Sequence, residues 1–172
     1  PLTHVFVQGG VGALPAAVAS HLEQALGGRR PRFLVVEPES ADCLYRSAEA
    51  GRPARASGDL RTVMGGLACG EPSRIAWEIL SRLADDFLAL GDEAALDAVR
   101  TLARGEDGDP AIEAGESGAA GVAAILEAVR VDGLAAELGL DEGSCVLTFG
   151  TEGAIDPDAF ERIVGRPPRR SP

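Results

Sequence analysis

The sequence predicts an α/β protein built on a mainly parallel sheet with helices on both faces, a three-layer αβα arrangement. Two observations favour this fold class. Short apolar segments rich in β-branched and aromatic residues alternate along the chain with segments of helical spacing. The short segments are apolar throughout, which is typical of strands buried on both faces of a sheet. With 172 residues, 45% of them hydrophobic, the chain is long enough for one globular domain with a substantial core.

Four strands and six helices are predicted. The strands are the apolar segments 4–7, 32–36, 87–90 and 145–149. The helices are expected at about 13–25, 40–49, 73–86, from 92 onward, 117–130 and 133–140. Three of these helices should be capped by a short polar side chain that accepts a hydrogen bond from the first free N–H groups, namely by Ser40, Asp92 and Ser117.

The remaining segments should be irregular. Residues 51–60 are rich in Gly, Pro and Arg, residues 62–69 contain a glycine pair, and residues 105–110 form a charged turn. After residue 149 we expect a polar turn, and after residue 165 a disordered tail over 166–172. On the helix at 73–86, the apolar spacing predicts one core-facing stripe, made of Ile75, Ile79, Leu80 and Leu83.

The charge balance excludes some partners. The net charge is -11, with 27 acidic and 16 basic residues, and every basic residue is arginine. An acidic chain is a poor ligand for nucleic acid or for an anionic membrane surface. The three cysteines show no C-x-x-C spacing, and no apolar run reaches the length of a membrane span. We therefore expect a cytoplasmic protein, and a start at Pro1 just ahead of a strand suggests a fragment or a processed chain.

The segment after the first predicted strand is a candidate phosphate-binding loop. Residues 8–13 read QGGVGA and lie between a strand and a helix. Small residues let successive backbone N–H groups approach a phosphate, and the helix N-terminus adds a positive dipole end. The loop has no lysine and is not G-x-G-x-x-G, so it fits neither a Walker A loop nor the dinucleotide fingerprint. A purely structural tight turn is the alternative.

Further motifs follow this loop in a specific order. They are HVFVQGGVGA at 4–13, VEP at 36–38, ADCLYRS at 41–47, TVMGGLACGEP at 62–72, AGESGA at 114–119 and GTEG at 150–153. The series resembles the fold-type II pyridoxal-phosphate enzymes, the group of tryptophan synthase β, serine racemase and threonine dehydratase. ADCLYRS and GLACGEP, with GESGA and TEG after them, are similar to the diaminopropionate ammonia-lyases in particular. The resemblance extends to about Val164 and implies that residues 1–165 are the C-terminal part of a lyase catalytic domain.

The resemblance implies pyridoxal 5'-phosphate as the cofactor and a role for each matching position. Backbone N–H groups of the loop would hold the phosphate, those of Gly9, Gly10, Val11, Gly12 and Ala13. Thr151 would bond the pyridine nitrogen, and a hydroxyl there moderates the electron sink, which suits elimination over transamination. Glu116 would lie near the cofactor, and the ring edge would be lined by Gly66, Leu67 and Ala68. The alternatives are that Thr151 caps a turn and that Glu116 is a solvated carboxylate.

No metal site is expected. Glu37 before Pro38 matches one carboxylate of a metal site in serine-racemase-like relatives. The position of the second carboxylate matches Cys43, and Asp42 is one residue away from it. A thiol in place of a carboxylate removes a hard oxygen ligand, so the set is incomplete.

The sequence contains no lysine. The resembling family holds its cofactor as a Schiff base on a lysine near the start of the enzyme, and its acid–base carboxylates lie mostly upstream of the glycine loop. No catalytic residue is therefore predicted in this chain, and the chain alone is expected to be inactive. Either an N-terminal half that carries the lysine is missing, which we favour, or the chain is a degenerate paralogue.

The resemblance implies that the intact enzyme, a homodimer, eliminates ammonia from 2,3-diaminopropionate and yields pyruvate and two ammonia. A threonine or serine dehydratase of the same fold is the nearest alternative. A nucleotide-binding module using the glycine loop and Glu37 is a second alternative, although it leaves Glu116 and Thr151 without a role. A non-catalytic oligomerisation or regulatory half is a third.

Overall fold

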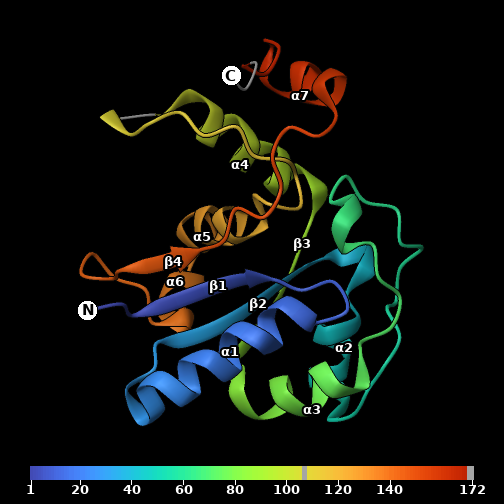
Figure 1. The fold of residues 1–172 in the computed structure, drawn as a ribbon, viewed down its shortest axis with the longest axis vertical. Coiled ribbons are helices and arrows are strands. Elements are labelled where there is room, and N and C mark those ends of the chain that lie inside the picture. Colours follow the sequence, from blue (N-terminus) through green and yellow to red (C-terminus); the bar gives the residue numbers. More distant parts are fainter. Residues whose placement is uncertain (106–107, 170–172) are drawn as a thin grey trace.

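The computed structural model describes residues 1–105 and 108–169 (Figure 1). Within these residues, four parallel strands form one sheet in the order β3-β2-β1-β4. They are β1 His4–Gln8, β2 Arg32–Pro38, β3 Asp86–Leu90 and β4 Val146–Thr148. In the central pair, Val5 lies opposite Phe33 and Val7 opposite Val35. The prediction of an α/β fold with a parallel sheet is confirmed, and each predicted strand is present within one or two residues of its expected bounds.

Helices cover both faces of the sheet (Figure 1). One face carries α1 Ala13–Leu26, α2 Cys43–Ala50 and α3 Arg74–Leu83. The other face carries α4 Asp92–Arg104, α5 Ala120–Arg130 and α6 Leu134–Leu138, and α7 Pro157–Val164 packs against α4. The central strand supplies both cores, because Val5 and Val7 point toward the α1 side and Phe6 points toward the α5 side.

The strand order reverses once, beside β1. From β1 the chain moves outward to β2 and then to β3, and it returns through α4, α5 and α6 to place β4 on the other side of β1 (Figure 1). In open parallel sheets the strand ends at such a reversal leave a crevice at their carboxyl ends, where ligands bind. The carboxyl ends of β1 and β4 are therefore the expected place for a site.

One helix was not predicted. Residues 157–164 form α7, which was expected to belong to a polar turn. Asp156 caps this helix by accepting hydrogen bonds from Asp158 N at 3.0 Å and Ala159 N at 2.9 Å, with Pro157 in the first turn. Phe160 is buried against α4. Beyond α7, Arg166 and Arg169 both bind Glu113, and residues 170–172 of the expected tail lie outside the described residues.

Three predicted caps are wrong, because each side chain has a tertiary partner instead. Ser40 Oγ donates to Arg61 O at 2.7 Å, and α2 begins only at Cys43 after a short 3-10 turn, Glu39–Ala41. Asp92 is the first residue of α4 and binds residues 62 and 63. Ser117 lies three residues before α5 and binds residue 66.

The predicted core stripe of α3 is wrong at one position. Ile75 is 74% exposed, whereas Ala76, Trp77 and Leu80 are buried against α1 and the sheet. Alanine fits closely packed helix contacts, so the spacing of large apolar residues alone favoured Ile75 over the neighbouring Ala76. In the described part of the chain, no helix has both the length and the apolar character needed to cross a bilayer.

Candidate functional site

The glycine loop connects β1 directly to α1. Gly10 has φ +60 and Gly12 has φ +95, in the left-handed region that favours glycine. Gly9 N donates to Val36 O at 2.8 Å, and Gly12 N donates to Gly9 O at 3.1 Å. These two bonds close the loop into a tight turn at the N-terminus of a 14-residue helix.

Not all five predicted N–H groups face outward. Those of Gly9 and Gly12 donate to Val36 O and Gly9 O inside the chain. Those of Gly10 and Ala13 have no partner among residues 1–105 and 108–169, and the Val11 N–H group lies against the sulfur of Cys69. Free N–H groups at a helix N-terminus suit an anion.

The loop is packed closely against the α2 and α3 side. A Cβ atom added to Gly9 would lie 2.7 Å from Glu37 Cγ, and one added to Gly12 would lie 3.0 Å from Ala76 Cβ. Neither position has room for a side chain without movement of its neighbours. Val11 O also accepts from Ser73 N at 2.8 Å, the residue that caps α3.

Glu37 is a buried carboxylate directly below this loop. It is 1% exposed and accepts hydrogen bonds from Leu44 N at 3.0 Å and Tyr45 N at 2.8 Å, in the first turn of α2. Burial raises the pKa of Glu37 to about 7, while the two N–H groups oppose the rise. Cys43 Sγ lies 3.5 Å from Glu37 Oε1, and burial also raises the pKa of this thiol.

The residues weighed as metal ligands have other partners. Asp42 accepts from Ser57 N at 2.8 Å and from Arg46 Nε at 2.9 Å. Although burial opposes it, these bonds lower the pKa of the Asp42 carboxyl. In the described residues, no three His, Cys, Asp or Glu side chains are grouped so that they could hold a metal ion.

The glycine pair at 65–66 lies beside the loop in a 3-10 turn, Gly65–Leu67. A Cβ atom at Gly10 would be 3.7 Å from Gly66 O and 3.9 Å from Leu67 Cδ2. Ser117 Oγ accepts from Gly66 N at 3.0 Å, so the GESGA segment holds the turn from its other side.

A second contact fixes the chain just before this turn. Asp92 accepts from Thr62 Oγ1 at 2.5 Å and from Val63 N at 3.1 Å. Asp92 follows β3 at the carboxyl end of the sheet, so the sheet itself positions the turn.

A cavity of about 210 Å³ lies next to the turn. Its polar lining includes Glu116 and Glu152 together with the backbone of Gly66, and its apolar lining includes Val99 and Phe160. Gly115 has no room for a side chain. A Cβ atom added to it would overlap the Glu152 side chain and lie 2.6 Å from Gly153 O. Glu116 is half-buried and borders this cavity.

Thr151 follows β4 at the carboxyl end of the sheet and is joined to the end of β1 by Gln8. Gln8 Nε2 donates to Phe149 O at 2.9 Å and also to Thr151 Oγ1. Gln8 is 3% exposed, and its Oε1 is buried without a partner in the described part of the chain. The loop and Thr151 therefore meet at the point where the strand order reverses.

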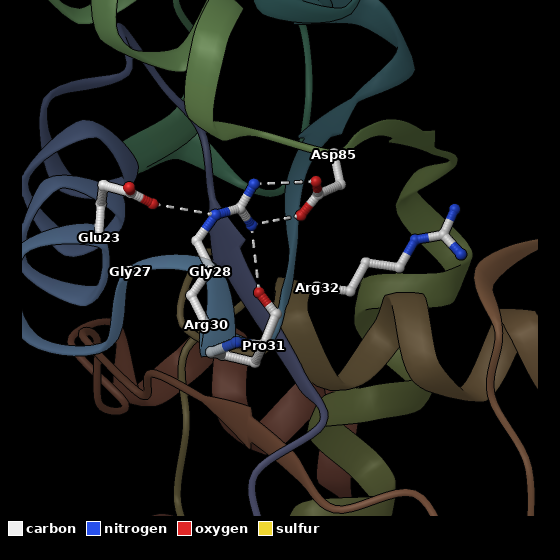
Figure 2. Close-up of a pocket in the computed structure, with 7 residues that line it drawn as sticks. All are labelled: Glu23, Gly27, Gly28, Arg30, Pro31, Arg32 and Asp85. Atoms are coloured by element: carbon white, nitrogen blue, oxygen red, sulfur yellow. Dashed lines mark hydrogen bonds and ion pairs between the residues drawn. The ribbon is translucent and has the colours of Figure 1, made fainter.

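A second hollow lies at the opposite end of the sheet (Figure 2). It measures about 520 Å³ and is lined by residues near the amino ends of β2 and β3. Arg30 in it points between Glu23 and Asp85 and forms two bonds to Asp85, of 2.6 and 3.0 Å (Figure 2). Arg32 binds Asp86, with Nε 2.6 Å from Oδ2. Because these guanidinium groups are already paired, the hollow lacks free charge for a ligand.

A comparison with known protein families identifies the family of the chain. Residues 1–146 match the family model described as "Pyridoxal-phosphate dependent enzyme". The chain belongs to this family of pyridoxal-phosphate-dependent enzymes. The match includes the glycine loop, the Gly65–Leu67 turn and Glu116, and it ends before Thr151.

Within the family, the chain is similar to diaminopropionate ammonia-lyase. It is 38% identical to the enzyme from Escherichia coli strain K12 over 166 residues, which are 94% of this chain and 42% of the relative. Two crystal structures of the Escherichia coli enzyme superpose on 95% of this chain, which corresponds to 41% of each of those chains. The holo form has a TM-score of 0.86 at 36% identity, and the complex with D-serine has a TM-score of 0.84 at 34% identity. L-threonine ammonia-lyase from Thermotoga maritima is 25% identical over 78% of this chain and 30% of the relative.

The chain thus spans about two fifths of the length of these diaminopropionate ammonia-lyases. The resemblance to a segment of such an enzyme, inferred from the motifs, is confirmed by this similarity and by the fold.

The residues present fit the phosphate and ring of the family cofactor. The loop offers free N–H groups at a helix N-terminus, and side chains are excluded from Gly9 and Gly12. The buried Gln8 Oε1 has no partner among the described residues, which leaves a hydrogen-bond acceptor available beside the loop. A lysine to hold the cofactor covalently is absent from this sequence.

Three residues of the site were given no role there, or a different role, from the sequence. Gln8 was read only as part of the loop, and Asp92 and Ser117 only as helix caps. A polar residue at the end of an otherwise apolar strand, as in HVFVQ, is the signal that could have singled out Gln8. For Asp92 and Ser117 the sequence holds no such signal, because a cap and a tertiary acceptor use the same side-chain oxygen.

Proposed function

We propose that this chain is the cofactor-binding segment of a pyridoxal-phosphate-dependent ammonia-lyase that converts 2,3-diaminopropionate and water into pyruvate and two ammonia. The observation that carries the proposal is the junction of β1 and β4, where Gln8 joins the glycine loop to Thr151. The higher identity to diaminopropionate ammonia-lyase, 38% against 25% for the threonine enzyme, supports the choice of substrate.

The loop would bind the phosphate. The N–H groups of Gly10 and Ala13 would donate to phosphate oxygens, with the positive end of the α1 dipole behind them, whereas that of Val11 already faces the sulfur of Cys69. Gly9 and Gly12 would contribute shape rather than hydrogen bonds, because their N–H groups already have partners. The absence of Cβ atoms at these two positions lets the loop stay flat against Glu37 and Ala76.

The Gly65–Leu67 turn would lie along the ring edge, since Gly66 O and the Leu67 side chain already border Gly10. Ser117 and Asp92 would hold this turn in place from opposite sides. Glu116 would lie near the cofactor at the rim of the 210 Å³ cavity, where a carboxylate attracts the ammonium groups of the substrate.

Thr151 would contact the pyridine nitrogen. When bound, the cofactor supplies an electron sink that makes the substrate Cα–H bond acidic enough to break. A hydroxyl opposite the ring nitrogen moderates this sink more than a carboxylate would, which favours loss of a β-substituent over transamination. Gln8 Nε2 donates a hydrogen bond to the Thr151 hydroxyl.

The remaining chemistry would come from the part of the complete protein outside this chain. The sequence has no lysine to hold the cofactor, and the groups that move protons to and from substrate are expected upstream of the loop. The isolated chain is therefore expected to be inactive, and the complete enzyme is expected to be a cytoplasmic homodimer. A threonine or serine dehydratase is the alternative that the same segment would also serve.

The test uses the complete protein that contains this chain, purified with pyridoxal phosphate. Bound cofactor would be followed by absorbance, and pyruvate and ammonia would be measured with 2,3-diaminopropionate, threonine and serine. We expect two ammonia per pyruvate and preference for diaminopropionate. Turnover of threonine or serine alone would move the protein to the dehydratases, and failure to bind the cofactor would contradict the proposal.

A variant and its control refine this test. Thr151→Val removes only the hydroxyl and should lower kcat at least about tenfold, the loss expected for one hydrogen bond of about 1.4 kcal/mol in the transition state. Thr101→Val on α4 makes the same change away from the site and should leave kcat unchanged.

A further inference from the structure

We propose that Gln8 is a positioning residue that makes Thr151 a hydrogen-bond donor to the cofactor ring nitrogen and so keeps that nitrogen unprotonated. The inference rests on the proposed function, because it needs Thr151 to face the ring. It adds Gln8, a residue to which neither the motifs nor the family assignment give a role.

The position of Gln8 is fixed by the sheet. It is the last residue of β1, paired with Val36 of β2 and adjacent to the end of β4, and it is 3% exposed. Its amide reaches across to two residues of the segment after β4, Phe149 and Thr151. A side chain anchored in the centre of a parallel sheet has little freedom to reorient.

The Phe149 carbonyl determines which way the amide faces. A carbonyl oxygen only accepts, so the group 2.9 Å from Phe149 O must be the Gln8 NH₂ group. The opposite orientation would place two oxygens against each other. The second hydrogen of the same NH₂ group then points to Thr151 Oγ1.

The Thr151 hydroxyl is therefore an acceptor toward Gln8. A hydroxyl has one hydrogen, and with a lone pair already engaged by Gln8 that hydrogen is left to donate elsewhere. A ring nitrogen opposite Thr151 would receive it through its lone pair. If the ring nitrogen were protonated instead, Thr151 would accept from two donors, and its own hydrogen would need a third partner.

The unpartnered Gln8 Oε1 agrees with this role. Among the described residues, the donor end of the amide makes two bonds and the acceptor end makes none. A buried acceptor without a partner is unfavourable, and an apolar side chain of similar size would avoid it. Packing of the sheet alone thus does not account for a glutamine here, whereas orientation of Thr151 does.

The experiment reads the ring nitrogen directly. The complete protein is loaded with pyridoxal phosphate labelled with ¹⁵N in the ring, and the ¹⁵N chemical shift is recorded together with the absorbance of the bound cofactor. We expect the wild-type shift of an unprotonated pyridine nitrogen that accepts a hydrogen bond. A pyridinium shift in the wild type would overturn the proposal.

Gln8→Glu tests the direction. Once ionised, a carboxylate only accepts, so the Thr151 hydroxyl would turn toward it and present its lone pair to the ring. We expect the ¹⁵N resonance to move to the pyridinium range at neutral pH. Gln24→Glu, at an exposed glutamine of α1, is the matched control and should leave the shift unchanged. An unchanged shift in Gln8→Glu with cofactor still bound would refute the proposal.

Two further variants cover other outcomes. If Gln8→Glu does not fold, Gln8→Leu is the test, because it removes the amide group that donates to Thr151. The ring nitrogen should then titrate at a higher pH than in the wild type. An identical titration in the two proteins would contradict the proposal. In a Thr151→Val background, Gln8→Glu should no longer move the resonance, because the hydroxyl that transmits the effect is gone. Absence of cofactor absorbance in the wild type would instead show that the proposed function itself fails.

Discussion

Gly9 lies directly against Glu37: a Cβ atom at residue 9 would come within 2.7 Å of Glu37 Cγ and 3.3 Å of its Cδ. The candidate phosphate loop is thus supported by a carboxylate that is itself held at the first turn of α2. The contact links the shape of the loop to a titratable group below it, and it leads to two of the predictions that follow.

Gly9→Ala should distort the loop. The added methyl group overlaps Glu37 Cγ, and relief of such overlap in a packed interior costs about 1–3 kcal/mol. In the complete protein we expect roughly tenfold or greater weakening of pyridoxal phosphate binding, measured by absorbance titration. Gly28→Ala, where a Cβ would meet nothing within 4 Å, is the control and should bind as the wild type does. Equal affinities of the two variants would contradict the packing argument.

Glu37 should make the stability fall as the pH rises. Its folded-state pKa of about 7 lies above the ordinary 4.5. Between these values the folded state keeps a proton that the unfolded chain has released. The resulting stabilisation is complete below pH 4.5 and is lost as the pH rises through 7, by up to roughly 3 kcal/mol.

The measurement is urea unfolding at pH 5 and at pH 8, for the wild type and for Glu37→Gln. The variant should lack this component of the pH dependence, because an amide does not titrate. Glu39→Gln, at an exposed position two residues further on, should keep it. The same pH dependence in the wild type and Glu37→Gln would show that Glu37 does not titrate in this range.

Ser117→Ala should loosen the turn beside the loop. The substitution leaves Gly66 N–H without its acceptor at 3.0 Å, and loss of a buried partner costs about 1–3 kcal/mol. We expect a lower urea midpoint and weaker cofactor binding. The matched change Ser81→Ala, on the exposed side of α3, should have little effect on either quantity. If both variants behaved alike, Ser117 would not hold the turn.

Asp92→Ala should release the same turn from the other side. It removes the acceptor of Thr62 Oγ1 and Val63 N, so we expect faster amide hydrogen exchange over residues 62–67 and a loss of about 1–2 kcal/mol in stability. Glu93→Ala, the next residue, removes an exposed ion pair with Arg100, which contributes about 0–1 kcal/mol. Unchanged exchange in Asp92→Ala would contradict the anchoring role.

The local pattern of apolar and polar residues was enough to predict much of the fold. The strands near 4–8 and 32–38 are recognisable because apolar β-branched runs bounded by Gly or Pro have few other structures open to them. Helix α7 was missed because polar residues, Asp156 and Asp158, flank its first residue Pro157, and because its apolar face is decided by contact with α4. The roles of Ser40, Asp92 and Ser117 were misassigned because a distant partner displaced a local cap.

The sequence by itself determined the parallel α/β fold, the glycine loop at the start of α1, the similarity to a lyase segment and the lack of a lysine. Only the tertiary structure decided that Gln8 meets Thr151, 143 residues away, and that Glu37 lies beneath Gly9. The physical reason is the strand order. The position of β4 beside β1 depends on the packing of helices against both faces of the whole sheet, and no local segment of the sequence encodes that position.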